Sequence, residues 1–198
     1  HAAVGGEADA VAGAAGGPKW LVLYHLDRLM LADFYNHCTR PLHFIGSSIG
    51  AWRFACYAQD RPLEAIDRFE EAYLGQTYSD DPDREEITAK SREILDYVLG
   101  ESGTAEILSH PVFRTNVMTV RSRNLVRSES RLALTAGLLF AATANAVKRE
   151  WLGAFFERVL FYDRRDRPPF FDLEGFPLTT VTTSERNLAE AILATGSI

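Results

Sequence analysis

The sequence predicts an α/β fold in which helices pack on a mainly parallel central sheet, in the three-layer α/β/α arrangement. Two observations lead to this prediction. Short apolar or β-branched segments alternate along the chain with longer segments whose apolar residues recur at helical spacing. Two glycine-rich turns, each between an apolar segment and a helical one, are typical of strand-to-helix connections. Helices between consecutive strands imply parallel pairing through right-handed crossovers.

Four strands are expected. Partial alternation of apolar and polar residues supports the third strand, and a run of β-branched residues supports the fourth. The predicted strands lie near residues 8–12, 41–46, 112–121 and 176–183.

Seven helices are expected between and after these strands. In the first of them, Leu23, Leu26 and Met30 fall on one helical face. The charged segment 79–83 separates the third helix from the fourth and is expected to cap the fourth. The predicted helices lie near residues 19–36, 49–59, 62–75, 84–99, 132–148, 149–160 and 185–195.

Residues 46–50, Gly-Ser-Ser-Ile-Gly, form a Gly-x-Ser-x-Gly pattern between a predicted strand and a predicted helix. This pattern is typical of a nucleophile elbow, a tight turn that exposes a serine hydroxyl beside the unpaired N–H groups of a helix N-terminus. Gly46 and Gly50 allow the strained backbone and the close approach of strand and helix that such a turn needs. The pattern therefore selects Ser48 as the nucleophile, with an ordinary strand-to-helix turn as the alternative.

A second glycine turn, at residues 13–19, opens the first predicted helix. Consecutive small residues in such a turn can point their backbone N–H groups outward, which is what an oxyanion hole requires. The same geometry suits a phosphate group. However, the turn matches neither the Gly-x-Gly-x-x-Gly fingerprint nor the Gly-Lys-Ser/Thr pattern of nucleotide-binding loops, so an oxyanion site is the favoured interpretation.

Residues 15–20, Ala-Gly-Gly-Pro-Lys-Trp, followed by the Gly-x-Ser-x-Gly turn, resemble the start of a bacterial patatin-like phospholipase. In that family a glycine-rich loop supplies the oxyanion hole and the elbow supplies the serine. An aspartate in a later Asp-Gly-Gly or Asp-Gly-Ala motif completes a Ser–Asp dyad, and no histidine is needed. The resemblance is specific over residues 8–60, and beyond them it depends on the order and type of the elements.

The resemblance implies roles for particular residues. Gly16 and Gly17 match the oxyanion glycines, Lys19 matches the basic residue of the loop, and Ser48 matches the nucleophile. Lys19 is thus a candidate substrate-binding residue, with a solvated lysine at a helix start as the alternative. Two positions depart from the family pattern, because Ala15 and Trp20 stand where the loop usually has glycine. The Trp20 side chain is expected to need a cavity of its own.

The aspartate of the expected dyad is missing from its usual motif, since no Asp-Gly pair occurs in residues 1–198. Residues 187–198 look like the helix and small-residue turn that precede this motif in the family. We therefore expect residues 1–198 to be a single, C-terminally incomplete patatin-like hydrolase domain, with the dyad aspartate beyond residue 198 and negligible turnover without it. Asp172 is the nearest internal substitute, although its spacing to glycine differs from the motif.

The resemblance implies a serine acyl hydrolase, a phospholipase or carboxylic ester hydrolase, that acts on a lipid or a small ester without a metal or organic cofactor. Segment 62–99 is expected to cover one side of the site. A Ser-His-Asp esterase is an alternative, but it needs a histidine after the serine, and His110 is the one histidine in that position. A catalytically degenerate domain that binds a lipid or a protein is a further alternative. The head group, acyl chain and oligomeric state stay open.

Composition supports a single compact unit and excludes some classes of function. The chain has 198 residues, of which 46% are hydrophobic, enough for one substantial core. A net charge of −6 gives no electrostatic reason to bind nucleic acid. Cys38 and Cys56 are the only cysteines and are far apart in the sequence, so free thiols in a reducing compartment are expected and no metal site is predicted.

The remaining apolar features favour a cytoplasmic protein. Residues 1–17 lack the basic start and long apolar run of a signal peptide, although the first residue is His1 rather than methionine. The apolar stretch 132–147 is shorter than the roughly 20 residues needed to span a bilayer, and it contains Asn145. A buried helix is the favoured interpretation, and an apolar surface that contacts lipid or a partner is the alternative. Contact with a membrane surface is therefore expected to be transient at most.

Overall fold

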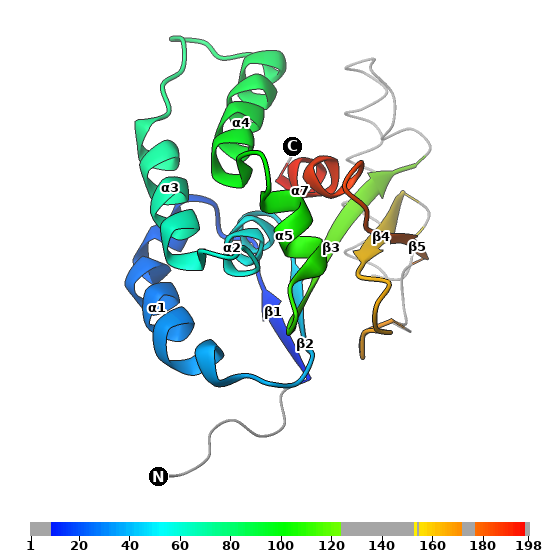
Figure 1. Cartoon of the computed structure of the whole chain (residues 1–198). Helices are drawn as coiled ribbons and strands as arrows, with labels where there is room; N and C mark the ends of the chain where they lie inside the picture. The colour runs from blue at the N-terminus through cyan, green and yellow to red at the C-terminus, as the bar shows by residue number, and fades with distance from the viewer. Residues whose placement is uncertain (1–8, 124–152, 154, 172–176, 197–198) are drawn as a thin grey trace.

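A computed structural model describes residues 9–123, 153, 155–171 and 177–196. Its centre is a five-stranded sheet in the order β1-β2-β3-β4-β5, which crosses the molecule in Figure 1. The strands are β1 (Ala10–Gly13), β2 (Leu42–Gly46), β3 (Phe113–Ser122), β4 (Phe156–Tyr162) and β5 (Leu178–Thr182). The pairs β1–β2, β2–β3 and β4–β5 are parallel, whereas β3–β4 is antiparallel. The predicted α/β class with a mostly parallel sheet is therefore confirmed.

The four predicted strands correspond to β1, β2, β3 and β5, but β4 contradicts the sequence prediction. Residues 156–160 were expected to end a helix, and they form a strand that pairs with β3 and β5. The reason is that a short apolar run such as Val159-Leu160-Phe161 suits a buried strand as well as a helix. Pairing with two distant segments decides between them. The antiparallel β3–β4 pair is likewise an exception to the expected parallel pairing.

The first predicted helix, 19–36, is one helical region whose winding changes along its length. It consists of η1 (Gly17–Leu23), α1 (Tyr24–Leu29), η2 (Met30–Phe34) and η3 (Tyr35–His37), which are a 3₁₀ turn, an α-helix, a π-type turn and a short 3₁₀ turn.

The other described helices follow the predictions, with one addition. They are α2 (Ile49–Tyr57), α3 (Pro62–Gly75), α4 (Arg84–Leu99), α5 (Gly103–Ser109) and α7 (Leu188–Gly196). Helix α5 was not predicted, and the expected helix 132–148 lies outside the described residues. As expected, the charged segment 79–83 caps α4, because the Asp83 carboxylate accepts the Glu86 amide at 2.8 Å.

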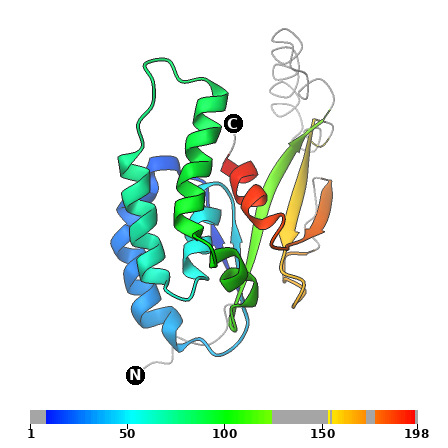
Figure 2. The ribbon, with the colours of Figure 1, turned by 45° about the horizontal axis from the view of Figure 1, so that its top comes forward.

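The described helices gather on one face of the sheet, as the two views in Figures 1 and 2 show. The strand order explains this arrangement. The crossovers from β1 to β2 and from β2 to β3 step in the same direction along the sheet, so right-handed connections place both sets of helices on the same face. Helix α7 joins this layer through contacts with α2 and α4. The described residues thus provide one of the two helical layers expected from the sequence.

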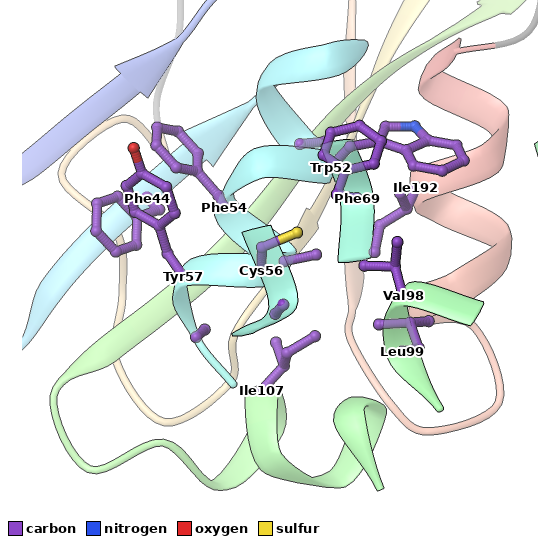
Figure 3. Packing of buried hydrophobic residues seen from close by; sticks show 14 of the residues in the cluster. Phe44, Trp52, Phe54, Cys56, Tyr57, Phe69, Val98, Leu99, Ile107 and Ile192 are labelled. Atoms are coloured by element: carbon purple, nitrogen blue, oxygen red, sulfur yellow. The ribbon is translucent and has the colours of Figure 1, made fainter. Parts of the chain in front are cut away.

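Helix α2 is the centre of the core, with eight of its nine residues buried. Toward the sheet, Phe54 stacks on Phe44 of β2 with ring centroids 4.6 Å apart. Toward the outer helices, Trp52 stacks on Phe69 of α3 at 5.5 Å, and Figure 3 shows both contacts. The remaining residue, Arg53, forms an ion pair with the buried Asp27 of α1. Because α2 is packed on every side, the turn that begins it is held in a fixed position.

Candidate active site

The turn between β2 and α2 has a strained backbone at Ser48. This residue has φ 52° and ψ −132°, and it is the only described non-glycine residue with a positive φ. An L-residue in such a region costs of order 1–3 kcal/mol, and observed outliers of this kind cluster at functional sites. Ser48 therefore has the local geometry of a nucleophile elbow.

Close backbone contacts explain the two glycines of the pattern. A Cβ atom on Gly50 would lie 2.2 Å from the carbonyl oxygen of Gly13, and one on Gly46 would lie 2.4 Å from Cα of Ala51. Both distances are too short for a real side chain. The Ser47 amide also donates to the Gly13 oxygen at 3.0 Å. The end of β1, the end of β2 and the start of α2 are thus pressed together, as the sequence predicted for Gly46 and Gly50.

The second glycine turn leaves backbone donors unused. Gly17 has φ +50°, in the region that favours glycine, and the Lys19 amide closes the turn by donating to the Gly16 oxygen at 3.2 Å. The amides of Gly16 and Gly17 have no acceptor among the described residues, and neither does the amide of Ile49, the first residue of α2. Unpaired backbone amides are the donors that an oxyanion requires.

One pocket of about 590 Å³ brings the predicted residues together, since Ser48, Gly16 and Gly17 all line it. This volume lies within the range of small-molecule sites. The apolar part of the lining includes Ile49, Trp52, Phe69, Tyr73, Ile87, Ile94 and Leu193. Helices α3 and α4 form one wall, as expected for segment 62–99. The pocket can therefore hold an apolar group next to the Ser48 hydroxyl.

Trp20 fills the space that its departure from the family pattern was expected to require. Its side chain is buried and stacks on Phe69 with ring centroids 4.5 Å apart, while Tyr73 packs edge-on at 5.7 Å. The cavity for Trp20 thus comes from α3. Since Phe69 and Tyr73 also line the pocket, Trp20 supports the pocket wall from behind.

The charged residue of the pocket is not the one that the sequence indicated. Lys19 is exposed and is not among the described residues that line the pocket. Arg84, at the start of α4, does line it, and its side chain has no ion-pair partner among the described residues. Sequence reasoning missed Arg84 because its place depends on how α4 packs beside α3.

No general base contacts the nucleophile within the described part of the chain, where the Ser48 hydroxyl has no hydrogen-bond partner. Asp172, the internal substitute considered above, lies outside the described residues.

His110 lies at the opposite end of the parallel strands from Ser48, because it precedes β3 whereas Ser48 follows the parallel strand β2. The five residues of β2 separate these edges by roughly 15 Å at about 3.3 Å per residue. The His110 Nδ1 atom accepts the amides of Val112 and Phe113 at 3.2 and 2.9 Å. Burial, with a contribution from nearby Arg165, lowers the pKa of His110 below its usual value. This arrangement disfavours a Ser-His-Asp triad.

Thr195, near the end of α7, is a site residue that the sequence analysis did not identify. The Ser48 amide donates to its Oγ1 atom at 2.9 Å, and the hydroxyl in turn donates to the Met118 carbonyl oxygen of β3 at 2.6 Å. No sequence signal could have indicated this role, because 147 positions separate Thr195 from Ser48.

Within the described ranges, no group of three or more potential metal ligands occurs, and no helix is long and apolar enough to cross a membrane. The apolar stretch 132–147 lies outside those ranges. Comparison of the chain with protein-family models, with curated proteins and with solved structures found no match.

Proposed function

We propose that this protein is a serine acyl hydrolase of the patatin-like type, with Ser48 as the nucleophile. One observation carries the proposal: the strained Ser48 lines the same pocket as Gly16 and Gly17, whose amides have no acceptor among the described residues. A three-layer patatin-like fold, a cytoplasmic location and transient contact with a membrane surface belong to the same proposal.

The reaction follows from these groups. The Ser48 Oγ atom attacks the carbonyl carbon of an ester while its proton passes to a general base. The carbonyl oxygen becomes an oxyanion, which the Gly16 and Gly17 amides bind. Each such donor is worth about 10²- to 10³-fold in rate. The alcohol then leaves with a proton, and a water molecule, activated by the same base, releases the acid and regenerates Ser48.

The base in this proposal is an aspartate supplied from outside the described residues. The patatin-like resemblance implies a Ser–Asp dyad, and the unbonded Ser48 hydroxyl leaves room for a partner. Asp172 is one candidate, and Asp172→Asn tests it directly. A variant that keeps full activity assigns the base to another aspartate.

The substrate is an ester with an apolar acyl group, in a lipid or in a small molecule. The apolar lining next to Ser48 supports this choice, because it offers a water-poor environment for the hydrocarbon part. The chemistry requires no metal or organic cofactor.

Reaction of the full-length protein with a fluorophosphonate probe tests the function. Such a probe modifies a serine that is activated and faces an oxyanion hole, and intact-mass and peptide analysis locate the adduct. We expect modification at Ser48, none in Ser48→Ala, and normal modification in the control Ser47→Ala. The control removes the neighbouring hydroxyl and keeps the hydrogen bond from the Ser47 amide to the Gly13 carbonyl oxygen.

The alternative function, a degenerate domain that binds a lipid or a protein, is favoured by the absence of a base next to Ser48 among the described residues. It predicts a different result of the same experiment. A folded full-length protein that the probe leaves unmodified at Ser48, and that hydrolyses no short acyl ester, contradicts the hydrolase proposal.

A further inference from the structure

Thr195 connects the nucleophile turn to two other parts of the molecule. It is the penultimate residue of α7, a helix that packs against β3, α2 and α4. The residues near it in α7, Leu193 and Gly196, line the same pocket as Ser48. Thr195 therefore lies where the pocket wall, the sheet and the turn meet.

Its hydroxyl makes two hydrogen bonds of complementary direction. It accepts the Ser48 amide at 2.9 Å and donates to the Met118 carbonyl oxygen at 2.6 Å. A hydroxyl can donate one hydrogen bond and can accept hydrogen bonds through its lone pairs, and the Thr195 hydroxyl does both here. Ser48 is thus anchored to β3, in addition to its covalent attachment to β2.

The hydrogen bond from the Ser48 amide to Thr195 also limits which amides can bind an oxyanion. Because Thr195 takes this N–H group, it is not available to an oxyanion. Among the described residues that line the pocket, Gly16, Gly17 and Ile49 have amides without an acceptor.

We propose that Thr195 is a positioning residue, which holds the strained Ser48 turn in place and directs the serine hydroxyl toward the Gly16, Gly17 and Ile49 amides. This inference rests on the proposed function of Ser48. The physical reason is that a residue in a sparsely populated backbone region keeps that conformation only where its surroundings fix it. A reacting atom displaced by about 1 Å can lose roughly 100-fold in rate.

Two variants of Thr195 and one control test this role. Thr195→Val keeps the shape of the side chain and removes both hydrogen bonds, whereas Thr195→Ser keeps the hydroxyl. The matched control is Thr183→Val. This substitution removes a threonine hydroxyl that donates to the Tyr162 carbonyl oxygen at 3.1 Å. Thr183 follows the end of β5, at the end of the sheet away from Ser48.

The first readout, on variants of the full-length protein, is the rate of fluorophosphonate modification at Ser48, together with kcat and KM for a short acyl ester. In Thr195→Val we expect the modification rate and kcat to fall about 10- to 100-fold, with KM changed less than about threefold. Thr195→Ser and Thr183→Val should stay within about threefold of the unsubstituted protein. A merely structural role for Thr195 predicts instead that Thr195→Val and Thr183→Val behave alike.

The second readout does not need activity. Hydrogen exchange of the Ser48 amide, followed by NMR, should be about five- to tenfold faster in Thr195→Val than in the unsubstituted protein, because the amide loses its acceptor. Thr195→Ser should restore the slow exchange. Unchanged exchange and unchanged modification in Thr195→Val overturn the proposal.

The two proposals fail in different ways. If the unsubstituted full-length protein is not modified at Ser48, the hydrolase function is wrong, and a positioning role for Thr195 in catalysis is wrong with it. If the unsubstituted protein is modified and Thr195→Val reacts equally fast, only the positioning role is wrong. Melting temperatures of the three variants show whether a loss of modification reflects unfolding.

Discussion

The two edges of the parallel strands β1–β3 differ in how their polar groups are used. At the carboxyl edge lie a strained serine, unpaired amides in the glycine turn and a pocket with an apolar wall. At the opposite edge several polar groups contact one another: Arg114 pairs with Asp166, Arg165 pairs with Asp163, and His110 accepts two amides. Unpaired donors beside an unbonded hydroxyl can bind a reacting group, whereas paired groups mainly stabilise the fold.

The largest expected effect is the loss of ester hydrolysis when the Ser48 hydroxyl, at the carboxyl edge, is removed. In the full-length protein, Ser48→Ala should lower ester hydrolysis by about 10⁴-fold or more, because it removes the atom that forms the acyl enzyme. Since Ser48 is only partly buried and its hydroxyl bonds no described residue, the free energy of unfolding should stay within about 0.5 kcal/mol. Kinetics and denaturant unfolding measure the two quantities. Activity retained in Ser48→Ala would remove the basis of the comparison.

The next effect concerns the close contacts that the carboxyl edge requires. Gly50→Ala places a Cβ atom 2.2 Å from the Gly13 oxygen, so we expect a loss of about 3 kcal/mol or more in stability, or failure to fold. Gly75→Ala is the matched control, since its Cβ meets nothing within 4 Å at the end of α3. It should change stability by less than about 1 kcal/mol. Equal stability of the two variants would contradict the close packing at Gly50.

A smaller effect tests the opposite edge. His110→Asn keeps an acceptor near the position of Nδ1, so it should cost about 1 kcal/mol or less in stability. It should leave the modification of Ser48 unchanged, because the length of β2 separates the two residues. Loss of modification in a folded His110→Asn protein would instead support the Ser-His-Asp alternative.

The smallest effect is a pH dependence of stability. Burial is the main cause that lowers the pKa of both His110 and His43 in the folded protein, relative to the ordinary value of 6.5. The unfolded chain therefore binds protons first as the pH falls, so stability is complete above pH 6.5 and is lost as the pH falls through the lowered pKa values. Denaturant unfolding between pH 7 and about 5 measures this loss. His110→Asn should reduce its slope, and an unchanged slope would show that His110 does not contribute.

The difference between local and long-range requirements explains which predictions succeeded. The elbow and the glycine turn were predictable because their requirements are local: a tight turn, a positive φ or a backbone contact selects glycine at a few adjacent positions. The strands β1, β2 and β3 were predictable from short apolar segments. Strand β4 was not, since Val159-Leu160-Phe161 has no periodicity that distinguishes a buried strand from a helix, and its pairing partners are distant in the sequence.

The site was only partly predictable for the same reason. Ser48, Gly16 and Gly17 were identified from local patterns, and the roles assigned to them stay predictions. Thr195 and Arg84 were not identified, because a threonine at a helix end or an arginine at a helix start has no distinctive pattern. Their importance comes from where α7 and α4 pack. Lys19 shows the reverse case, since a matching sequence position is exposed and outside the described lining of the pocket.

The sequence alone thus determined the α/β class, the turn that presents Ser48 and the turn that carries the unpaired glycine amides, because backbone sterics act between neighbouring residues. Only the tertiary structure decided that the two turns share one pocket, that His110 lies at the other edge of the sheet, and that Thr195 anchors the Ser48 amide to β3. These relations depend on strand order and helix packing, which join residues far apart in the chain.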